Sequence, residues 1–143
     1  MRSTVTGKTH ARGLIDTNVV IHLVGLKSAN LPEAMVISAV TLAELSAGPH
    51  HTADPAERAR RTSLLQHSEA TFDPLPFDAE SARAFGQICS AVIAAGRKPP
   101  SRTADLMIAA TAMVHSLPLY TTNPRDFAAL DDLVTVVAVP RPS

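Results

Sequence analysis

The chain has 143 residues, of which 45% are hydrophobic and 18% charged, a composition typical of one globular domain with its own core and not of a disordered protein. The 13 basic and 13 acidic residues give a formal net charge of +0, so no overall positive field attracts nucleic acid or an anionic membrane, and any phosphate contact must be local. With 3% aromatic residues and no tryptophan, the chain lacks the stacking surfaces of sequence-tolerant single-strand binders.

The expected location is the cytoplasm. The single Cys89 cannot form an internal disulfide, which suits a reducing compartment, and its apolar, helical context predicts a buried, unreactive thiol. Residues 1–13 are polar and lack the apolar centre of a signal peptide, and no apolar run is long enough for a membrane span. We therefore expect no membrane association.

A short apolar stretch before Asp16 predicts a first strand that carries this carboxylate to the edge of a sheet. Residues 1–12 lack periodicity and are expected to form a flexible lead-in. Because ligands of open α/β sheets bind beyond the carboxyl ends of the strands, Asp16 would face a crevice. The alternative is that Asp16 and Asn18 only cap the next helix, expected at Val19–Leu23 with Asn18 as N-cap and Gly25 beyond its end.

A second acid lies in the next strand and helix pair. Residues 35–38 are a short apolar run that suits a buried parallel strand. The helix expected at Thr41–Ala47 ends at Gly48, which Pro49 follows. Glu44 lies inside this mostly apolar helix, where it either belongs to an exposed stripe or faces the crevice.

Two longer helices are predicted in the middle of the chain. The run Asp54–Glu57 combines an N-cap, a proline at the first helical position and an acid in the first turn, so a helix is expected from there to about Ala70. Asp78 caps the next helix, which runs through Ala95 with apolar residues at helical spacing. Between them, Phe72–Phe77 contains two prolines and suits a short edge strand.

A third acid begins the next helix. Thr103–Val114 is apolar almost all round, which predicts a buried helix. Asp105 in its first turn either complements the helix dipole or marks the place where the core opens onto the crevice. The basic, proline-rich loop Arg97–Arg102 precedes it and either approaches a phosphate backbone or simply connects two helices.

The last part of the chain adds two strands and a fourth acid. Leu119–Thr122 is the next expected strand, and a polar turn with Asp126 follows it at Asn123–Phe127. Leu133–Val139 is the last apolar strand. Since strands and helices alternate along residues 1–143, we predict a single domain with an α/β fold, a three-layer sandwich whose mostly parallel central sheet is flanked by helices.

The four acids Asp16, Glu44, Asp105 and Asp126 each lie near a strand end or at the start of a following helix. In a parallel sheet those ends share one edge, so the acids are expected to gather there. Such carboxylates would repel one another and persist only with a neutralising cation. Oxygen ligands favour Mg²⁺ or Mn²⁺, which orient an attacking water and neutralise a scissile phosphate. Phosphodiester hydrolysis is the natural reaction.

Four segments follow one another along the chain: Leu-Ile-Asp-Thr-Asn, Ser-Ala-Val-Thr-Leu-Ala-Glu-Leu-Ser-Ala-Gly, Thr-Ala-Asp-Leu-Met-Ile-Ala-Ala and Leu-Tyr-Thr-Thr-Asn-Pro-Arg-Asp-Phe. In this order they resemble the PIN-domain family, and most closely its VapC-type toxins of prokaryotic toxin-antitoxin pairs. The likeness spans about residues 13–139, nearly the whole chain. It implies a Mg²⁺-dependent endoribonuclease, in which Mn²⁺ could replace the magnesium. It also implies an RNA substrate, a homodimer, and inhibition by a cognate VapB-type antitoxin that covers or enters the site.

The resemblance also implies roles for the acids. Asp16 would be the central metal ligand and Asp105 the second, and Glu44 would complete the site directly or through water. In the last motif either Asn123 or Asp126 could hold the metal or the nucleophilic water; Asp126 is favoured for its charge and Asn123 for hydrogen bonding.

Three further residues would support this site. The resemblance implies that Thr17 and Asn18 orient Asp16 or contact phosphate, and that Arg125 touches RNA.

The sequence leaves two other functions open. A phosphatase of the haloacid-dehalogenase kind would also use an Asp at a first strand end, although it usually needs a second Asp where Asn18 stands. A catalytically silent PIN-like binding module is the other.

Overall fold

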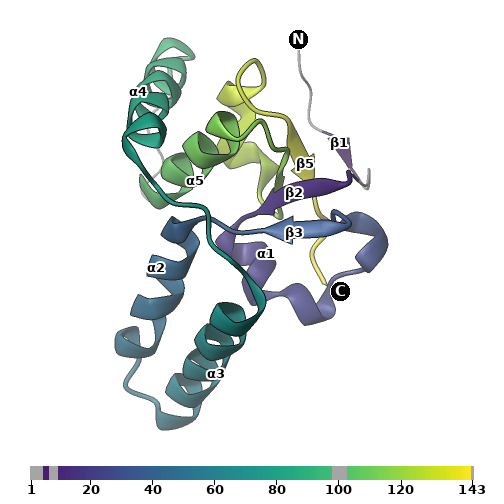
Figure 1. Cartoon of the computed structure of the whole chain (residues 1–143), viewed down its shortest axis with the longest axis vertical. Coiled ribbons are helices and arrows are strands. Elements are labelled where there is room, and N and C mark those ends of the chain that lie inside the picture. Colours follow the sequence, from purple (N-terminus) through teal and green to yellow (C-terminus); the bar gives the residue numbers. More distant parts are fainter. Residues whose placement is uncertain (1–4, 7–9, 98–102, 143) are drawn as a thin grey trace.

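The protein folds around a five-stranded parallel sheet with the strand order β1-β5-β4-β2-β3 (Figure 1). The structure is a computed structural model and describes residues 5–6, 10–97 and 103–142. The α/β fold with a mostly parallel sheet flanked by helices is thus confirmed. The strands are β1 (Val5–Thr6), β2 (Arg12–Ile15), β3 (Ala34–Val36), β4 (Leu119–Thr121) and β5 (Val136–Ala138).

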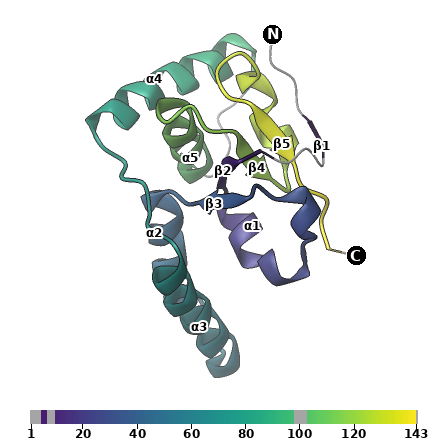
Figure 2. The ribbon, with the colours of Figure 1, turned by 45° about the vertical axis from the view of Figure 1, so that its right-hand side comes forward.

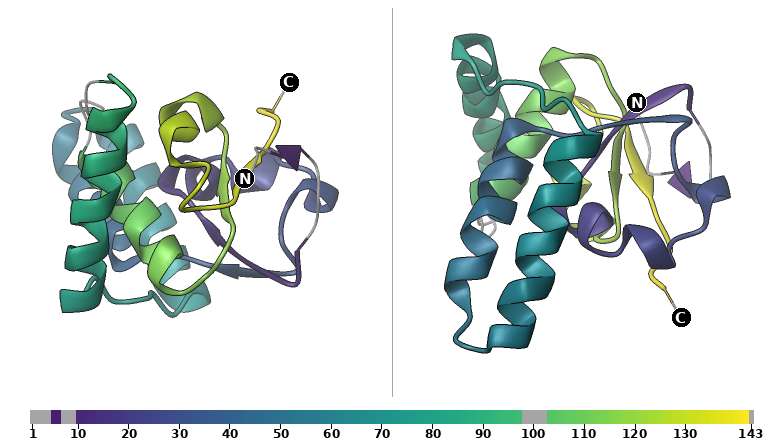
Figure 3. Two further views of the ribbon diagram at one scale, coloured as in Figure 1. Left: turned by 90° about the horizontal axis from the view of Figure 1, so that it is seen from above. Right: turned by 60° about the horizontal axis from the view of Figure 1, so that its bottom comes forward.

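Helices cover both faces of this sheet, and all five predicted helices are present. In the described part of the chain, α2 and α3 form an antiparallel pair that extends away from the sheet (Figures 1 and 3). A one-turn helix follows β2, and a longer 3₁₀ segment, η4, follows β4. The bounds are α1 (Thr17–Ile21), α2 (Ala39–Ala47), α3 (Pro55–Thr71), α4 (Ala79–Ala94), α5 (Thr103–Val114) and η4 (Pro124–Leu130).

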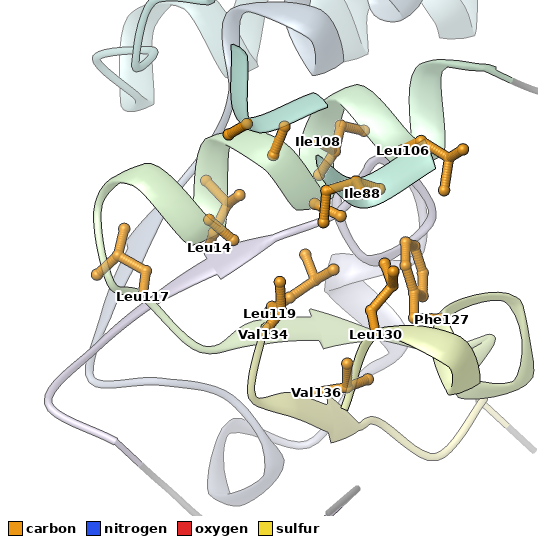
Figure 4. Packing of buried hydrophobic residues seen from close by; sticks show 14 of the residues in the cluster. Leu14, Ile88, Leu106, Ile108, Leu117, Leu119, Phe127, Leu130, Val134 and Val136 are labelled. Carbon is orange, nitrogen blue, oxygen red and sulfur yellow. The ribbon is translucent and has the colours of Figure 1, made fainter. Parts of the chain in front are cut away.

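Alternate residues of the central strands point to opposite faces and create two cores, as the two-residue period of a strand requires. Leu14, Leu119 and Val136 face α4, α5 and η4, where they meet Ile88 and Phe127 (Figure 4). The intervening residues of the same strands belong to a second core on the side of α1 and α2. The sheet is therefore buried on both faces, which explains why its strands are nearly continuous apolar runs.

Short polar side chains begin several helices: α3 and α4 start at their predicted caps, and α1 and α2 start two residues before their predicted starts. The side chain of Ser38 accepts a hydrogen bond from the Val40 N–H at 3.0 Å at the start of α2. Asp78 accepts one from the Ser81 N–H at 3.0 Å at the start of α4. These caps satisfy backbone donors that have no partner inside the helix. The local cap signals therefore locate the starts of α3 and α4.

Several local predictions differ from the structure. The lead-in contains β1, which pairs with β5 over only two residues and so leaves no pattern in the sequence. Phe72–Phe77 forms no strand, because it contributes a single bridge between Leu75 and Ser38. Cys89 is half-buried and not fully enclosed. The basic loop before α5 lies outside the described residues from position 98 to 102.

No helix among the described residues combines the length and the apolar character that crossing a membrane would require.

Candidate active site

Asp16 lies at the carboxyl edge of the sheet, between the end of β2 and the start of α1. Its backbone N–H donates to the Tyr120 carbonyl at 3.1 Å, which ties it to β4. Its side chain, not that of Asn18, caps α1 by accepting a hydrogen bond from the Val19 N–H at 3.0 Å. The capping role is therefore confirmed for Asp16 and wrong for Asn18. Capping does not explain why Asp16 is buried beside other acids.

The surroundings of Asp16 disfavour its charge. The residue is 4% exposed. Burial, with repulsion from the carboxylates of Asp105 and Glu44, raises the pKa of Asp16 from 3.8 to about 6, although hydrogen bonds from the Thr121 hydroxyl and the Val19 N–H act in the opposite direction. The carboxylates of Glu44 on α2 and Asp105 on α5 therefore both act on Asp16 at this edge. Such an arrangement is typical of functional sites.

Glu44 is held in place by α1. The Thr17 hydroxyl donates to Glu44 Oε1 at 2.6 Å, and Thr17 Oγ1 also lies 3.1 Å from Thr41 Oγ1. Thr17 and Thr41 are buried, and Glu44 is half-buried. Glu44 thus faces the site and not the outer stripe of α2. Beside it, a cavity of about 710 Å³ opens between α1, α2 and α3.

Asp105 and Asp126 differ in their position relative to Asp16. Asp105 lies half-buried in the first turn of α5, where its charge reaches Asp16. Asp126 is exposed on η4, and its backbone N–H donates to the Asn123 carbonyl at 3.1 Å. Its charge is not among the influences on the pKa of Asp16. The structure therefore brings three of the four predicted acids together and leaves Asp126 at the rim.

Asn123 and Thr121 connect the last motif to Asp16. The Asn123 N–H donates to Thr121 Oγ1 at 3.0 Å, and the Thr121 hydroxyl donates to the Asp16 carboxylate. The Asn123 side-chain oxygen accepts a hydrogen bond from Arg141. Neither Thr121 nor Arg141 was predicted as a site residue, because threonine is ordinary in a strand and Arg141 is distant in the chain. A hydroxyl at a strand end, level with Asp16, is the signal that could have found Thr121.

The two remaining predicted residues make few contacts. Among the described residues, neither Asn18 nor Arg125 has a side-chain hydrogen bond or ion pair. Asn18 is half-buried in α1, where its carbonyl accepts the His22 N–H at 3.1 Å, and Arg125 is exposed on η4. Both side chains are therefore available to a ligand.

The donor set of the site suits a hard cation. Asp16, Glu44 and Asp105 offer carboxylate oxygens, the ligands that Mg²⁺ and Mn²⁺ prefer, and a divalent ion would stabilise the Asp16 carboxylate against the burial and the repulsion that raise its pKa. As the side chains are arranged over the described residues, no three His, Cys, Asp or Glu groups approach closely enough to hold a metal ion together. The residues fit such an ion in charge and chemistry, and binding would require them to move closer.

Comparison with known proteins identifies the family of this fold. The PIN domain matches residues 13–133, which include every acid described above. The chain belongs to the PIN domain family. Ribonuclease VapC5 of Mycobacterium tuberculosis is 37% identical to this PIN domain over 131 residues, which cover 90% of this chain and 94% of the relative.

Solved structures agree with this assignment. A member of the VapBC family of toxin-antitoxin systems, VapBC-5 from Mycobacterium tuberculosis, matches this PIN domain with a TM-score of 0.77 and 35% identity, over 90% of this chain and 98% of the other. FitAcB from Neisseria gonorrhoeae matches with a TM-score of 0.68 and 30% identity, over 87% of this chain and 95% of the other. The resemblance to VapC-type proteins, inferred from four short segments, is confirmed.

Proposed function

We propose that this PIN domain is a metal-dependent endoribonuclease and the toxin of a toxin-antitoxin pair. The observation that carries the proposal is the buried Asp16, whose pKa is raised to about 6 by burial and by Asp105 and Glu44. Buried acids that repel one another lower the stability of the folded protein, and cation binding would account for their presence. The name of the similar Ribonuclease VapC5 supports RNA as the substrate.

Asp16, Asp105 and Glu44 would hold a Mg²⁺ ion, for which Mn²⁺ could substitute. When bound, the ion would lower the pKa of a water molecule and neutralise charge on the scissile phosphate. Thr121 orients the Asp16 carboxylate and Thr17 orients Glu44. Asn123, or Asp126, which is exposed on η4, would position the phosphate or the water.

The proposed partner is a VapB-type antitoxin, which would silence the site by covering it. The structural neighbour VapBC-5 is a toxin-antitoxin system, which supports such a partner. We also propose a homodimer and a cytoplasmic location. Expression of the wild-type chain alone should arrest the growth of a bacterial host, and expression of the Asp16→Asn chain should not. Growth arrest by both chains would contradict the proposal.

Cleavage of a mixed cellular RNA pool by the purified chain tests the enzymatic part. We expect cleavage with Mg²⁺ or Mn²⁺, none with EDTA, and a loss of at least about 100-fold in the Asp16→Asn and Asp105→Asn proteins. Asp132→Asn is the matched control, because Asp132 is an exposed acid beyond η4 and its variant should cut as the wild type does. Release of phosphate from small esters without RNA cleavage would favour a phosphatase.

A further inference from the structure

The C-terminal segment reaches the same edge of the sheet as Asp16. Strands β4 and β5 are parallel with Thr121 opposite Ala138, and the Val139 N–H donates to the Thr121 carbonyl at 2.8 Å. Because β5 ends level with the site, the residues that follow it leave at the site. Figure 2 shows this segment running from β5 toward the turn that follows α1.

This segment is fixed at both ends around Arg141. The hydrogen bond of Val139 holds its start, and a Cβ on Gly25 would lie only 3.2 Å from Pro142, so Gly25 permits a close approach at its end. Pro140 and Pro142 flank Arg141 and restrict the backbone to extended conformations. These contacts hold the backbone on both sides of Arg141 at this edge of the sheet before any ligand binds.

The guanidinium group of Arg141 contacts the site directly. It donates to the side-chain oxygen of Asn123, whose N–H in turn donates to Thr121, the residue that holds Asp16. Over the described residues no other hydrogen bond or ion pair involves Arg141, and the side chain is exposed. A guanidinium group has five N–H donors in a planar fork that matches phosphate oxygens. Most of these donors remain for a ligand.

A polyanion can approach Asp16 only if a nearby cationic side chain offsets the repulsion from the acids. The acids around Asp16 repel a polyanion, and the protein has no net positive charge to offset that repulsion. Arg60 and Arg61 of α3 line the cavity beside Glu44, but both pair with Glu57, at 2.7 and 2.8 Å. Among the described residues, Arg141 is the cationic side chain with a hydrogen bond to the last motif of the site.

We infer that Arg141, with Asn123, forms a binding site for a backbone phosphate of the RNA next to the cleaved bond. The inference rests on the proposed function, because it assigns the substrate contact of that same site. Arg141 approaches the phosphate from the side of the sheet occupied by β5, opposite Glu44 on α2. It binds the substrate and takes no part in proton transfer.

Binding of a fluorescein-labelled, single-stranded RNA of random sequence tests the inference. The Asp16→Asn protein is the background, so that the probe stays intact, and Kd is measured over a series of KCl concentrations. Adding Arg141→Gln should raise Kd about tenfold and reduce the slope of log Kd against log salt by about 0.7, the value for one phosphate contact on a single strand. Arg141→Lys should keep the slope and weaken binding less.

Arg12→Gln is the matched control. Arg12 is exposed at the opposite end of β2 from Asp16, so its variant removes the same charge away from the site and should leave both Kd and slope nearly unchanged. If Arg141 only anchors the C-terminal segment, Arg141→Gln will lower the midpoint of thermal unfolding while its salt slope equals that of Arg12→Gln. That result would overturn the inference.

Cleavage by the otherwise wild-type chain separates this inference from the proposed function. Arg141→Gln should raise KM with little change in kcat, because the lost contact binds substrate and transition state alike. Cleavage by the wild type with no effect of Arg141→Gln on KM or Kd would overturn the inference alone. Binding that depends on Arg141 without any cleavage by the wild type would support the inference and overturn the proposed function.

Discussion

Replacing Asp16 by asparagine should stabilise the metal-free protein while abolishing its chemistry. The pKa of Asp16 is raised in the folded state from 3.8 to about 6, so the folded protein holds a proton that the unfolded chain releases as pH rises through this range. The free energy of unfolding of the wild type therefore decreases as pH rises from 3.8 to about 6, and it stays lower above pH 6. Asparagine is never charged and avoids this loss, and it can still cap α1 and accept the hydrogen bond of Thr121.

The size of the effect follows from the same pKa values. At about 1.4 kcal/mol per pH unit, linkage gives the Asp16→Asn protein an advantage of about 1.5 kcal/mol at pH 5 that grows to about 3 kcal/mol at pH 8. Urea unfolding in EDTA at both pH values measures it as the difference in the free energy of unfolding. The control Asp132→Asn replaces an exposed acid, and its stability relative to the wild type should not increase with pH.

Two outcomes would refute the reasoning about Asp16. The first is an Asp16→Asn protein that is no more stable than the wild type at pH 8. The second is an advantage that does not change between pH 5 and pH 8, because a constant difference cannot come from titration. Added Mg²⁺ should stabilise the wild type and narrow the gap, since an ion that binds only the folded state raises its stability.

The remaining predictions concern the support of the site and the sheet. Thr121→Val removes the hydroxyl that donates to Asp16, and should shift the pH–rate profile to higher pH and lower kcat about tenfold; an unshifted profile would contradict this role. Thr17→Val releases Glu44, and should lower kcat in the same RNA assay with little change in KM. Gly13→Ala would bring a Cβ within 2.6 Å of the buried Tyr120 ring and should cost about 1–3 kcal/mol in urea unfolding. Its control is Gly86→Ala in α4, where the added Cβ would have no heavy atom within 4 Å. This variant should raise the free energy of unfolding by about 0.5–1 kcal/mol.

Much of this protein was determined by local sequence alone. Apolar runs located β2, β3, β4 and β5, and short polar caps located the starts of the long helices, because both signals act between residues a few positions apart. The alternation of the two elements then implied the parallel sheet. A parallel sheet in turn requires that the strand end carrying Asp16 lie at the same edge as the other strand ends.

Only the tertiary structure decided which groups meet at that edge. Glu44 could have faced solvent, and its contact with Thr17 depends on how α2 packs against α1. Asp126 follows the motif pattern but turns outward on η4, while Thr121 and Arg141 reach the site because β4 lies between β2 and β5. The order of strands results from the packing of two cores over many residues, and no short segment of the chain encodes it.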